Sequence, residues 1–290
     1  MATAALDRPA AGRSRVRASP YWLLLLPLLV PLVLLYLVPL GRVLWISFTD
    51  PTPGLANYER LLAFPALQRV LFTTLRIGAI TTGLALLLGY LVAYVMVHAG
   101  PRHRLWVTAF VLVPFWVSLL VRAFAWLTLL RTEGVINQAL LGWGLIAQPL
   151  ALVHNELGVV IGMVHYMVPY ATLPLYANMQ GIDPRLADAS RSLGAGPLTT
   201  FLRIFLPLSL PGIAAAGVLV FIFSLGFFVT PALLGGGRVV MIAEYVSVQI
   251  LQTVRWGVGT MMASVLLLTV VLLLLAMSRV VDLRRLFGAR

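Results

Sequence analysis

Side chains that are able to catalyse a reaction or hold a metal ion are few in this chain and widely scattered. There is no cysteine, which excludes disulfides, thiolate metal sites and a catalytic thiol. The nine carboxylates all fall between the long apolar segments, whereas carriers driven by protons or sodium usually keep an ionisable group at mid-membrane. We therefore predict no catalytic residue and no metal ligand, and any driving energy would have to be supplied from outside the chain.

The most informative polar segment runs from Gly181 to Pro207. Asp183 suits a helix N-cap, Pro184 suits the first helical position, and Gly194 suits the residue just past a helix end. We predict a helix over Pro184–Leu193, about 15 Å long. One modestly apolar face recurs at helical spacing and consists of Leu186, Ala189, Ser190 and Leu193. From the residues alone, an ordinary surface helix and a docking element for another protein remain equally open.

The elements that must hold this segment are membrane spans. The chain has 290 residues, 61% hydrophobic and only 10% charged, with a mean hydropathy of +0.98, which excludes an ordinary soluble domain. A bilayer core needs about 20 mostly apolar residues per helix. Six segments meet this length, and they are Tyr21–Leu40, Ile77–Val97, Leu105–Leu130, Leu157–Met179, Leu208–Val229 and Met261–Met277.

The positive charge reports orientation rather than nucleic-acid binding. All 21 basic residues are arginines, and they lie in short gaps between apolar segments instead of forming one basic face. With the N-terminus placed in the cytoplasm, thirteen arginines fall inside and five outside. Inside loops of membrane proteins are the arginine-rich ones. The sequence thus predicts an all-α membrane protein of six spans with both termini cytoplasmic.

A spaced pattern in the long inside loop resembles the EAA loop of bacterial ABC importer permeases. That family has Glu-Ala-Ala, three residues, Gly, nine residues and Ile-x-Leu-Pro. This chain has Asp188-Ala189-Ser190, Gly194 and Ile204-x-Leu206-Pro207 at the same spacing. Aspartate keeps the carboxylate and serine keeps the small size. The resemblance covers the chain from about Leu71 onward and implies a type I ABC importer permease architecture.

Other segments are similar to the spermidine/putrescine-type members of that family. They are Pro114–Trp126, Val229–Gly236, Gly134–Gln138 and the stretch from Leu87 to Tyr94. The resemblance therefore implies transport of a small solute, with a polyamine as the expected ligand, across the bacterial inner membrane.

The resemblance also implies partners and a division of the chain. The partners are two ATP-binding subunits, a second homologous permease, an extracytoplasmic solute-binding protein and the lipid bilayer, with no nucleic acid. No cofactor is expected in this chain, because ATP and Mg would lie on the partner subunit. The expected parts are a cytoplasmic arm (1–20), a first span with an extracytoplasmic loop (21–70), a five-helix permease domain (71–281) with the coupling loop (181–207), and a cytoplasmic tail (282–290).

Asp183–Leu193 would be the coupling helix that contacts the ATP-binding subunit. Gly194 would let the chain turn closely against that partner, and Pro207 would fix the entry into the fifth span. The residues that the resemblance assigns to coupling are Asp183, Leu186, Asp188, Ala189, Ser190, Arg191, Leu193, Gly194, Ile204, Leu206 and Pro207.

A path for the solute is a weaker expectation. The third and fourth spans carry most of the polar and aromatic side chains, and aromatic faces can hold a passing cation. Pro169 and Pro174 are expected to break the fourth span locally. Ordinary interhelical packing, together with interface aromatics, is the favoured explanation of the same residues. The candidates are Trp116, Arg122, Trp126, Tyr166, Tyr170 and Tyr176.

Arg122 and His165 have their own structural alternatives. On one continuous third span, Arg122 would lie about 26 Å from the inner end and would snorkel or rest on Trp126. His165 is expected to be a hydrogen-bonded packing residue. Glu133 and Glu244 are candidate acidic groups at the outer rim.

Two other classes of function fit the sequence less well than a permease does. A secondary carrier or channel acting alone predicts an inverted repeat and a polar break at mid-membrane, and the sequence has neither. An intramembrane serine protease needs serine in a Gly-x-Ser-Gly setting, but Ser224 lies between Phe223 and Leu225.

Overall fold

The computed structural model describes residues 24–280, with side chains to residue 276. The predicted arm (1–20) and tail (282–290) lie outside this range, as do the first residues of the predicted first span. All regular elements within the range are helices, as predicted. Five segments are long and apolar enough to cross a membrane, and a bent pair makes a sixth candidate. The five are Leu26–Thr49, Pro65–His98, Glu156–Gln180, Pro197–Leu225 and Trp256–Ala276.

The chain divides into two units, of which the first ends at Trp45. Its described part holds α1 (Leu26–Leu32), a π-helical turn (Val33–Leu37) and the first residues of α2 (Val38–Thr49). None of the side chains described here is buried. A helix that is apolar all round and exposed is suited to contact with lipid or with other membrane helices. The predicted first span is therefore helical, but it continues nine residues past the predicted end at Leu40.

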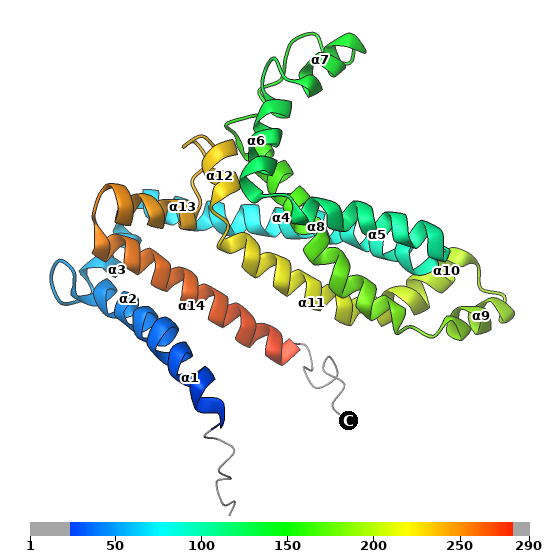
Figure 1. Ribbon diagram of the computed structural model, residues 1–290, viewed down its shortest axis with the longest axis horizontal. Coiled ribbons are helices and arrows are strands. Elements are labelled where there is room, and N and C mark those ends of the chain that lie inside the picture. Colours follow the sequence, from blue (N-terminus) through cyan, green and yellow to red (C-terminus); the bar gives the residue numbers. More distant parts are fainter. Residues whose placement is uncertain (1–23, 281–290) are drawn as a thin grey trace, which may run out of the picture. The chain divides into compact units, whose positions relative to one another are not determined.

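The second unit is built around three long helices that pack side by side (Figure 1). They are α4 (Pro65–His98), α8 (Glu156–Gln180) and α11 (Leu206–Leu225). Small residues allow their backbones to approach closely, which is how helices associate where lipid supplies no hydrophobic force. At Gly89 of α4, an added Cβ would lie only 2.8 Å from the Cβ of Ala171 in α8. Buried methionines fill the remaining gaps between these helices, namely Met96, Met163, Met167 and Met179.

A smaller apolar cluster joins the opposite end of α4 to the C-terminal helix. It consists of Leu67, Ile242, Met261 and Met262. These residues come from α4, α13 (Ile242–Ser247) and α14 (Trp256–Val280), and α3 (Ala56–Ala63) packs beside them. The Thr74 hydroxyl accepts a hydrogen bond of 2.8 Å from the backbone N–H of Ile242. This bond satisfies the donor at the start of α13 and fixes that helix to α4.

The predicted third span is not one straight helix. It consists of α5 (Pro101–Trp116) and α6 (Leu119–Leu130), and the chain bends by 100° between them. Pro114 lacks the N–H that would continue the helical ladder, and Val117 and Ser118 adopt extended backbone angles. The prediction of a continuous segment was wrong because hydropathy alone does not register this break.

Three other predicted spans, the second, fifth and sixth, begin later than the helices in the structure. The fourth span lacks the break that was predicted at its prolines. The helix at the second span begins at Pro65 rather than Ile77, and the helix leading into the fifth begins at Pro197 rather than Leu208. Helix α14 begins at Trp256 rather than Met261. Helix α8 matches the predicted fourth span within one residue at each end. It runs without interruption through Pro169 and Pro174, so the predicted local break is absent.

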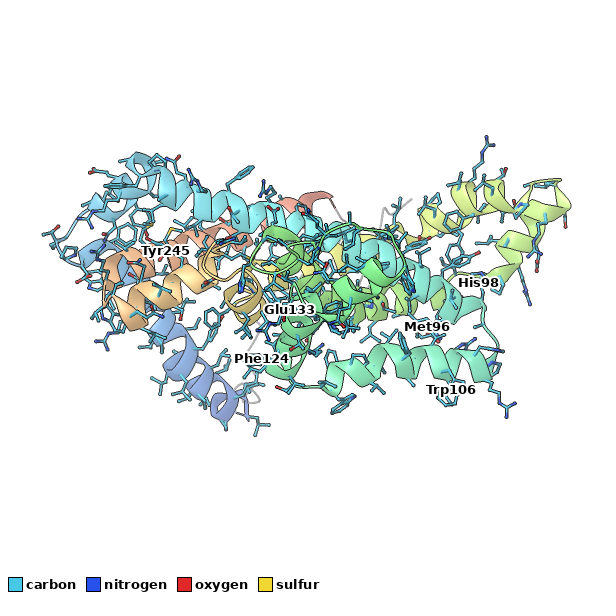
Figure 2. The ribbon with its side chains drawn as sticks, turned by 90° about the horizontal axis from the view of Figure 1, so that it is seen from above. Met96, His98, Trp106, Phe124, Glu133 and Tyr245 are labelled. Carbon is cyan, nitrogen blue, oxygen red and sulfur yellow. The ribbon has the colours of Figure 1, made fainter. Side chains whose placement is uncertain are left out.

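Short helices occupy the connections. They are α7 (Val135–Gly142), α9 (Pro184–Ser192), α10 (Pro197–Thr200) and α12 (Val229–Leu234). Helix α9 lies at one end of the three-helix core, and α13 lies at the other (Figure 1). Viewed from above, His98 marks the end that holds α9, and Tyr245 marks the opposite end (Figure 2). Helix α9, expected at the cytoplasmic surface, and α13, expected at the extracytoplasmic surface, are thus at opposite ends of the second unit.

Candidate functional site

Helix α9 has the local structure predicted from its sequence. The Asp183 side chain caps the helix by accepting a hydrogen bond of 2.9 Å from the N–H of Arg185, and Pro184 is the first helical residue. Asp188 and Arg191 form an exposed ion pair of 2.9 Å one turn apart. The helix ends at Ser192, one residue before the predicted end, and Gly194 follows with φ of +85°. That angle favours glycine because a Cβ would be strained there.

The predicted apolar face of α9 is mostly open. Leu186 is 45% exposed and Leu193 is 89% exposed, and Ala189 is also exposed. An added Cβ at Gly194 would meet no atom of the chain within 4 Å. Only Ser190 on this face is buried. The described part of the chain therefore leaves a short capped helix with two uncovered leucines at the end of the bundle.

One buried contact joins α9 to the next transmembrane helix. The hydroxyls of Ser190 and Thr200 lie 3.0 Å apart, with one donating to the other. Thr200 belongs to α10, which continues through a π-helical segment (Phe201–Phe205) into α11. This contact joins α9 directly to the first turn of the helix Pro197–Leu225.

An aromatic cluster that was not predicted from the sequence packs the start of the helix Pro197–Leu225 against α4. The rings of Tyr94 and Phe205 lie 5.2 Å apart edge to face, and Phe201 lies 5.7 Å from Tyr94 in the same geometry. His98 packs 5.5 Å from Phe205. These are favourable aromatic geometries. Their spacing of four residues within each helix (94 and 98, 201 and 205) was a signal that one face of each helix carries them.

The motif residues at the end of the loop lie inside a helix rather than before one. Ile204 and Leu206 are half-buried, and Pro207 is exposed. Pro207 was expected to fix the entry into the fifth span, but the helix has already started at Pro197. The π-helical turn at Phe201–Phe205 ends two residues before this proline. Such turns and prolines are common causes of bends in long helices.

The structure brings together four of the six residues expected along a solute path. Arg122 and Trp126 of α6 face Tyr166 of α8 around a cavity of about 10 Å³, room for about one water molecule. Tyr166 and Tyr170 have stacked rings and hydroxyls 3.3 Å apart. The other two residues lie elsewhere. Trp116 is 86% exposed, and the Tyr176 hydroxyl accepts a hydrogen bond from Gln180.

Arg122 has a different environment from the one predicted. Its guanidinium lies over the ring of Tyr166 at 4.4 Å rather than on Trp126. Its Nε and Nη1 atoms are buried and have no hydrogen-bond partner among the described residues. The estimate of 26 Å along one straight helix was wrong, because the bend at Val117–Ser118 removes the straight helix. Trp126 instead donates a hydrogen bond of 3.1 Å to Nδ1 of His165, so His165 is hydrogen-bonded as expected.

The two candidate acidic rim residues differ in burial. Glu133 is exposed in the connection between α6 and α7. Glu244 is 9% exposed, and its Oε2 has no hydrogen-bond partner in the described part of the chain. Burial raises the pKa of Glu244, and a hydrogen bond from the backbone of Met241 partly offsets the shift. Glu156, at the start of α8, is paired with Arg76 of α4.

Comparison with known proteins identifies the family. Residues 85–286 match the family described as binding-protein-dependent transport system inner membrane component. The spermidine/putrescine transport system permease protein PotB of Escherichia coli is 34% identical over 226 residues, which cover 78% of this chain and 81% of that protein. PotB of Haemophilus influenzae is 33% identical over 204 residues, covering 70% and 71%.

Solved structures show the same fold at lower sequence identity. A bacterial ABC transporter involved in import of the acidic polysaccharide alginate matches with a TM-score of 0.71 and 20% identity, over 90% of this chain and 95% of that one. Its complex with an alginate-bound periplasmic protein matches with a TM-score of 0.75 and 19% identity, over 89% and 93%. The chain therefore belongs to the binding-protein-dependent transport system inner membrane components, the permease subunits of ABC importers, and is a multi-pass protein of the inner membrane.

Proposed function

We propose that this permease forms half of the translocation pathway for a polyamine and that α9 is the helix through which ATP hydrolysis on a separate subunit drives it. The single observation that carries the coupling role is the exposure of α9. A capped helix with uncovered Leu186 and Leu193 stands at one end of the core and is tied to a transmembrane helix through Ser190 and Thr200. A rigid, partly apolar knob of this kind suits a groove on a partner protein.

The proposed assembly contains two ATP-binding subunits, a second homologous permease and an extracytoplasmic binding protein. ATP and Mg would be bound by the ATP-binding subunits, so this chain would need no cofactor of its own. Among the described residues, no three His, Asp or Glu side chains gather in a way that would hold a metal. Both termini and α9 would lie in the cytoplasm, which follows from the distribution of arginines between the spans.

The ligand proposal is supported by the names of the two relatives described above, which are 33% and 34% identical to this chain. Both are spermidine/putrescine permeases, whereas the alginate transporters share only 19–20% identity with this chain. Tyr166 and Tyr170 present aromatic rings that can hold an ammonium group. The described spans carry no carboxylate apart from Glu156 at the first position of α8, where it is paired with Arg76. The anionic groups for a polycation would therefore come from the second permease or from the outer rim, where Glu133 and Glu244 are the candidates.

The coupling role is tested by Gly194→Asp in the complete complex reconstituted into proteoliposomes. Gly196→Asp is the matched control, because Gly196 lies in the same loop, has φ of −70° and has equally open space around its Cα. We expect Gly194→Asp to abolish ATPase stimulation by liganded binding protein, or to release the ATP-binding subunits, while Gly196→Asp keeps both. Full stimulation in the Gly194→Asp complex would show that the coupling assignment is wrong.

The ligand is tested by uptake into the same proteoliposomes. We expect ATP-dependent uptake of labelled spermidine or putrescine in the presence of the cognate binding protein. Uptake of an anionic oligosaccharide without uptake of either polyamine would reject the polyamine and leave the coupling proposal intact.

A further inference from the structure

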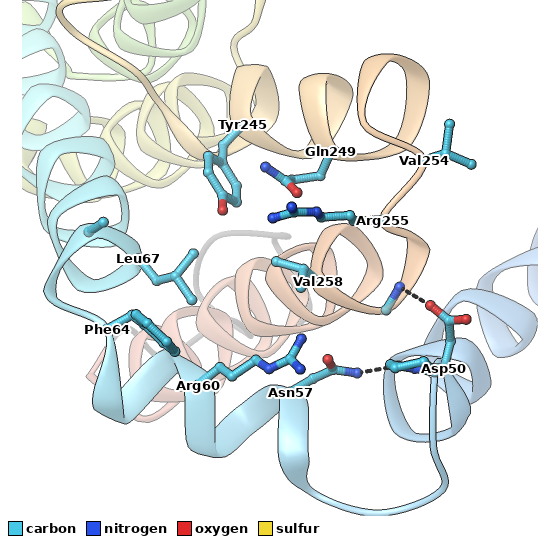
Figure 3. Close-up of a pocket in the computed structure, with 13 residues that line it drawn as sticks. Asp50, Asn57, Arg60, Phe64, Leu67, Tyr245, Gln249, Val254, Arg255 and Val258 are labelled. Atoms are coloured by element: carbon cyan, nitrogen blue, oxygen red, sulfur yellow. Dashed lines mark hydrogen bonds between the residues drawn. The ribbon is translucent and has the colours of Figure 1, made fainter.

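A cavity of about 700 Å³ lies at the end of the second unit opposite α9. Its walls come from the segment around α3, the start of α4, the helical segment from α13 to Gln252 and the start of α14 (Figure 3). None of the residues proposed for coupling or for the solute path lines it. The cavity therefore needs an explanation of its own.

Two arginines from distant parts of the sequence point into this cavity. Arg60 comes from α3, and Arg255 comes from the residue before α14 (Figure 3). Neither guanidinium has a carboxylate partner within 4.0 Å among the described residues. Two unpaired guanidinium groups that face one space form a site for an anion, and their forked donors match the oxygens of a phosphate.

Other polar side chains in the wall add further hydrogen-bonding groups. Tyr245 and Gln249 lie beside Arg255 (Figure 3). Burial raises the pKa of the Tyr245 hydroxyl, an effect that the nearby Arg255 charge partly offsets, so this group is a neutral donor. Asp50 is the one acidic residue of the lining, and its carboxylate already accepts a hydrogen bond of 2.6 Å from the N–H of Gly257. The lining thus keeps a net positive charge.

The wall is held in place by backbone contacts. The N–H of Arg255 donates to the carbonyl of Gln249 at 2.8 Å, and Val254 beside it has φ of +54°. Asn57, which is 2% exposed, donates to the carbonyl of Asp50 at 2.6 Å and to that of Ser47 at 3.1 Å. The two arginines are therefore carried by segments whose backbones are fixed, as a preorganised site requires.

The position of the cavity favours a lipid as the source of the phosphate. Pro65 and Trp256 are the first residues of two helices that are long and apolar enough to cross a membrane, so the cavity lies at the ends of two candidate spans. Phe64 is 56% exposed, Trp256 is 45% exposed and Val254 is 66% exposed around its edge. Aromatic residues at this level mark the interface with lipid headgroups, and arginines there attract anionic lipids.

We propose that Arg60 and Arg255 bind the phosphate group of an anionic phospholipid whose headgroup enters this cavity and whose acyl chains lie against the exposed apolar edge. The site is independent of the transported solute and of α9. Its occupant would hold α3 and the start of α14 together at the membrane surface, since each arginine comes from one of these two segments.

The test is lipid binding by the purified complex, measured by native mass spectrometry in titrations with palmitoyl-oleoyl phosphatidylglycerol or phosphatidylcholine. We expect one phosphatidylglycerol to bind about tenfold more tightly than phosphatidylcholine. Arg60→Gln/Arg255→Gln should remove this preference. The control variant Arg69→Gln/Arg238→Gln should keep the preference for phosphatidylglycerol. It also removes two arginines, but both are exposed and neither lines the cavity. Equal lipid binding by wild type and the first double variant would overturn the proposal.

Two further arms identify the occupant. Inorganic phosphate, titrated against bound phosphatidylglycerol, should displace it only weakly; displacement at low phosphate concentration would mean that the site takes the free anion. In liposomes of phosphatidylcholine alone, liganded binding protein should stimulate the ATPase activity of the Arg60→Gln/Arg255→Gln complex as much as that of wild type. A selective loss there would assign the arginines to an acidic protein surface and reject the lipid.

The arginines can also be tested without the double glutamine variant. If it fails to assemble, Arg60→Lys/Arg255→Lys retains both charges but loses the forked donors, and we expect weakened phosphatidylglycerol binding. The wild-type complex alone also decides the question, since absence of any preference for phosphatidylglycerol over phosphatidylcholine contradicts the site.

Discussion

The hydroxyls of Ser190 and Thr200 lie 3.0 Å apart in a buried contact between α9 and the helix that begins at Pro197. Replacing either partner leaves the other hydroxyl without its bond, at a cost of about 1 kcal/mol, which corresponds to about fivefold in an equilibrium. We expect Ser190→Ala and Thr200→Val each to reduce ligand-stimulated ATPase in proteoliposomes by about this factor. The double variant should be no worse than either single one.

Ser192→Ala is the matched control for this pair. Its hydroxyl donates to the Asp188 carbonyl within α9 itself, so its removal should leave stimulation unchanged. Fully additive losses in the Ser190 and Thr200 double variant would contradict a direct link between the two side chains.

Gly194→Ala should destabilise the coupling loop, whereas Gly196→Ala should not. Gly194 has φ of +85° and Gly196 has φ of −70°, so only the first substitution places a Cβ in the left-handed region, at a cost of about 1–2 kcal/mol. We expect fewer ATP-binding subunits to co-purify with Gly194→Ala. Equal recovery for both variants would show that the loop adapts without penalty.

Arg122→Gln should lower the spermidine concentration that gives half-maximal uptake. The guanidinium covers the Tyr166 ring at 4.4 Å and repels a second cation at the same face. A cation–π contact contributes about 0.5–2 kcal/mol, so we expect an effect of about two- to thirtyfold. Arg131→Gln removes an exposed arginine at the end of the same helix and serves as control. A loss of uptake confined to Arg122→Gln would instead assign the guanidinium itself to the path.

Glu244 should make the complex less stable as the pH rises. Its pKa is raised by burial in the folded protein, so the protonated form is favoured by folding. The stability gained is fully present below the ordinary pKa of 4.5 and is lost as the pH rises through the raised value. Glu244→Gln should therefore raise the unfolding temperature in detergent more at pH 8 than at pH 5. Glu133→Gln, at an exposed carboxylate, should show no such difference.

The proposed orientation can be measured directly because the chain has no cysteine. A single cysteine in place of Asp188 should react only with reagents that cross the membrane, and one in place of Glu133 should react with impermeant reagents added to intact cells. Both residues are exposed, so access rather than burial decides the result. Labelling of position 188 from outside would reverse the topology.

The sequence predicted α9 well because its determinants are local. The cap at Asp183, the first-turn proline and the glycine with positive φ all act within a few residues. It predicted the early starts of α4 and of the helix at Pro197 poorly, since both helices extend beyond the apolar residues that hydropathy measures. Hydropathy also missed the bend after Trp116, because apolar residues lie on both sides of it.

The contacts of individual side chains were the least predictable part of the site. Arg122 was expected on Trp126, one turn along a straight helix, and instead lies on Tyr166 of another helix. The pair of Arg60 and Arg255 was not recognised, because only the tertiary packing of α3, α13 and α14 brings these residues to one cavity. Local spacing carries no information about such pairs.

The near contact between Gly89 and Ala171 has a consequence for how the permease moves. At this point the backbones of α4 and α8 approach so closely that not even a methyl group fits between them without displacement. No solute can pass through that seam, and sliding one helix past the other would drive Ala171 into a neighbouring, larger side chain. We therefore expect α4 and α8 to move together as one body when the permease alternates between inward-open and outward-open forms.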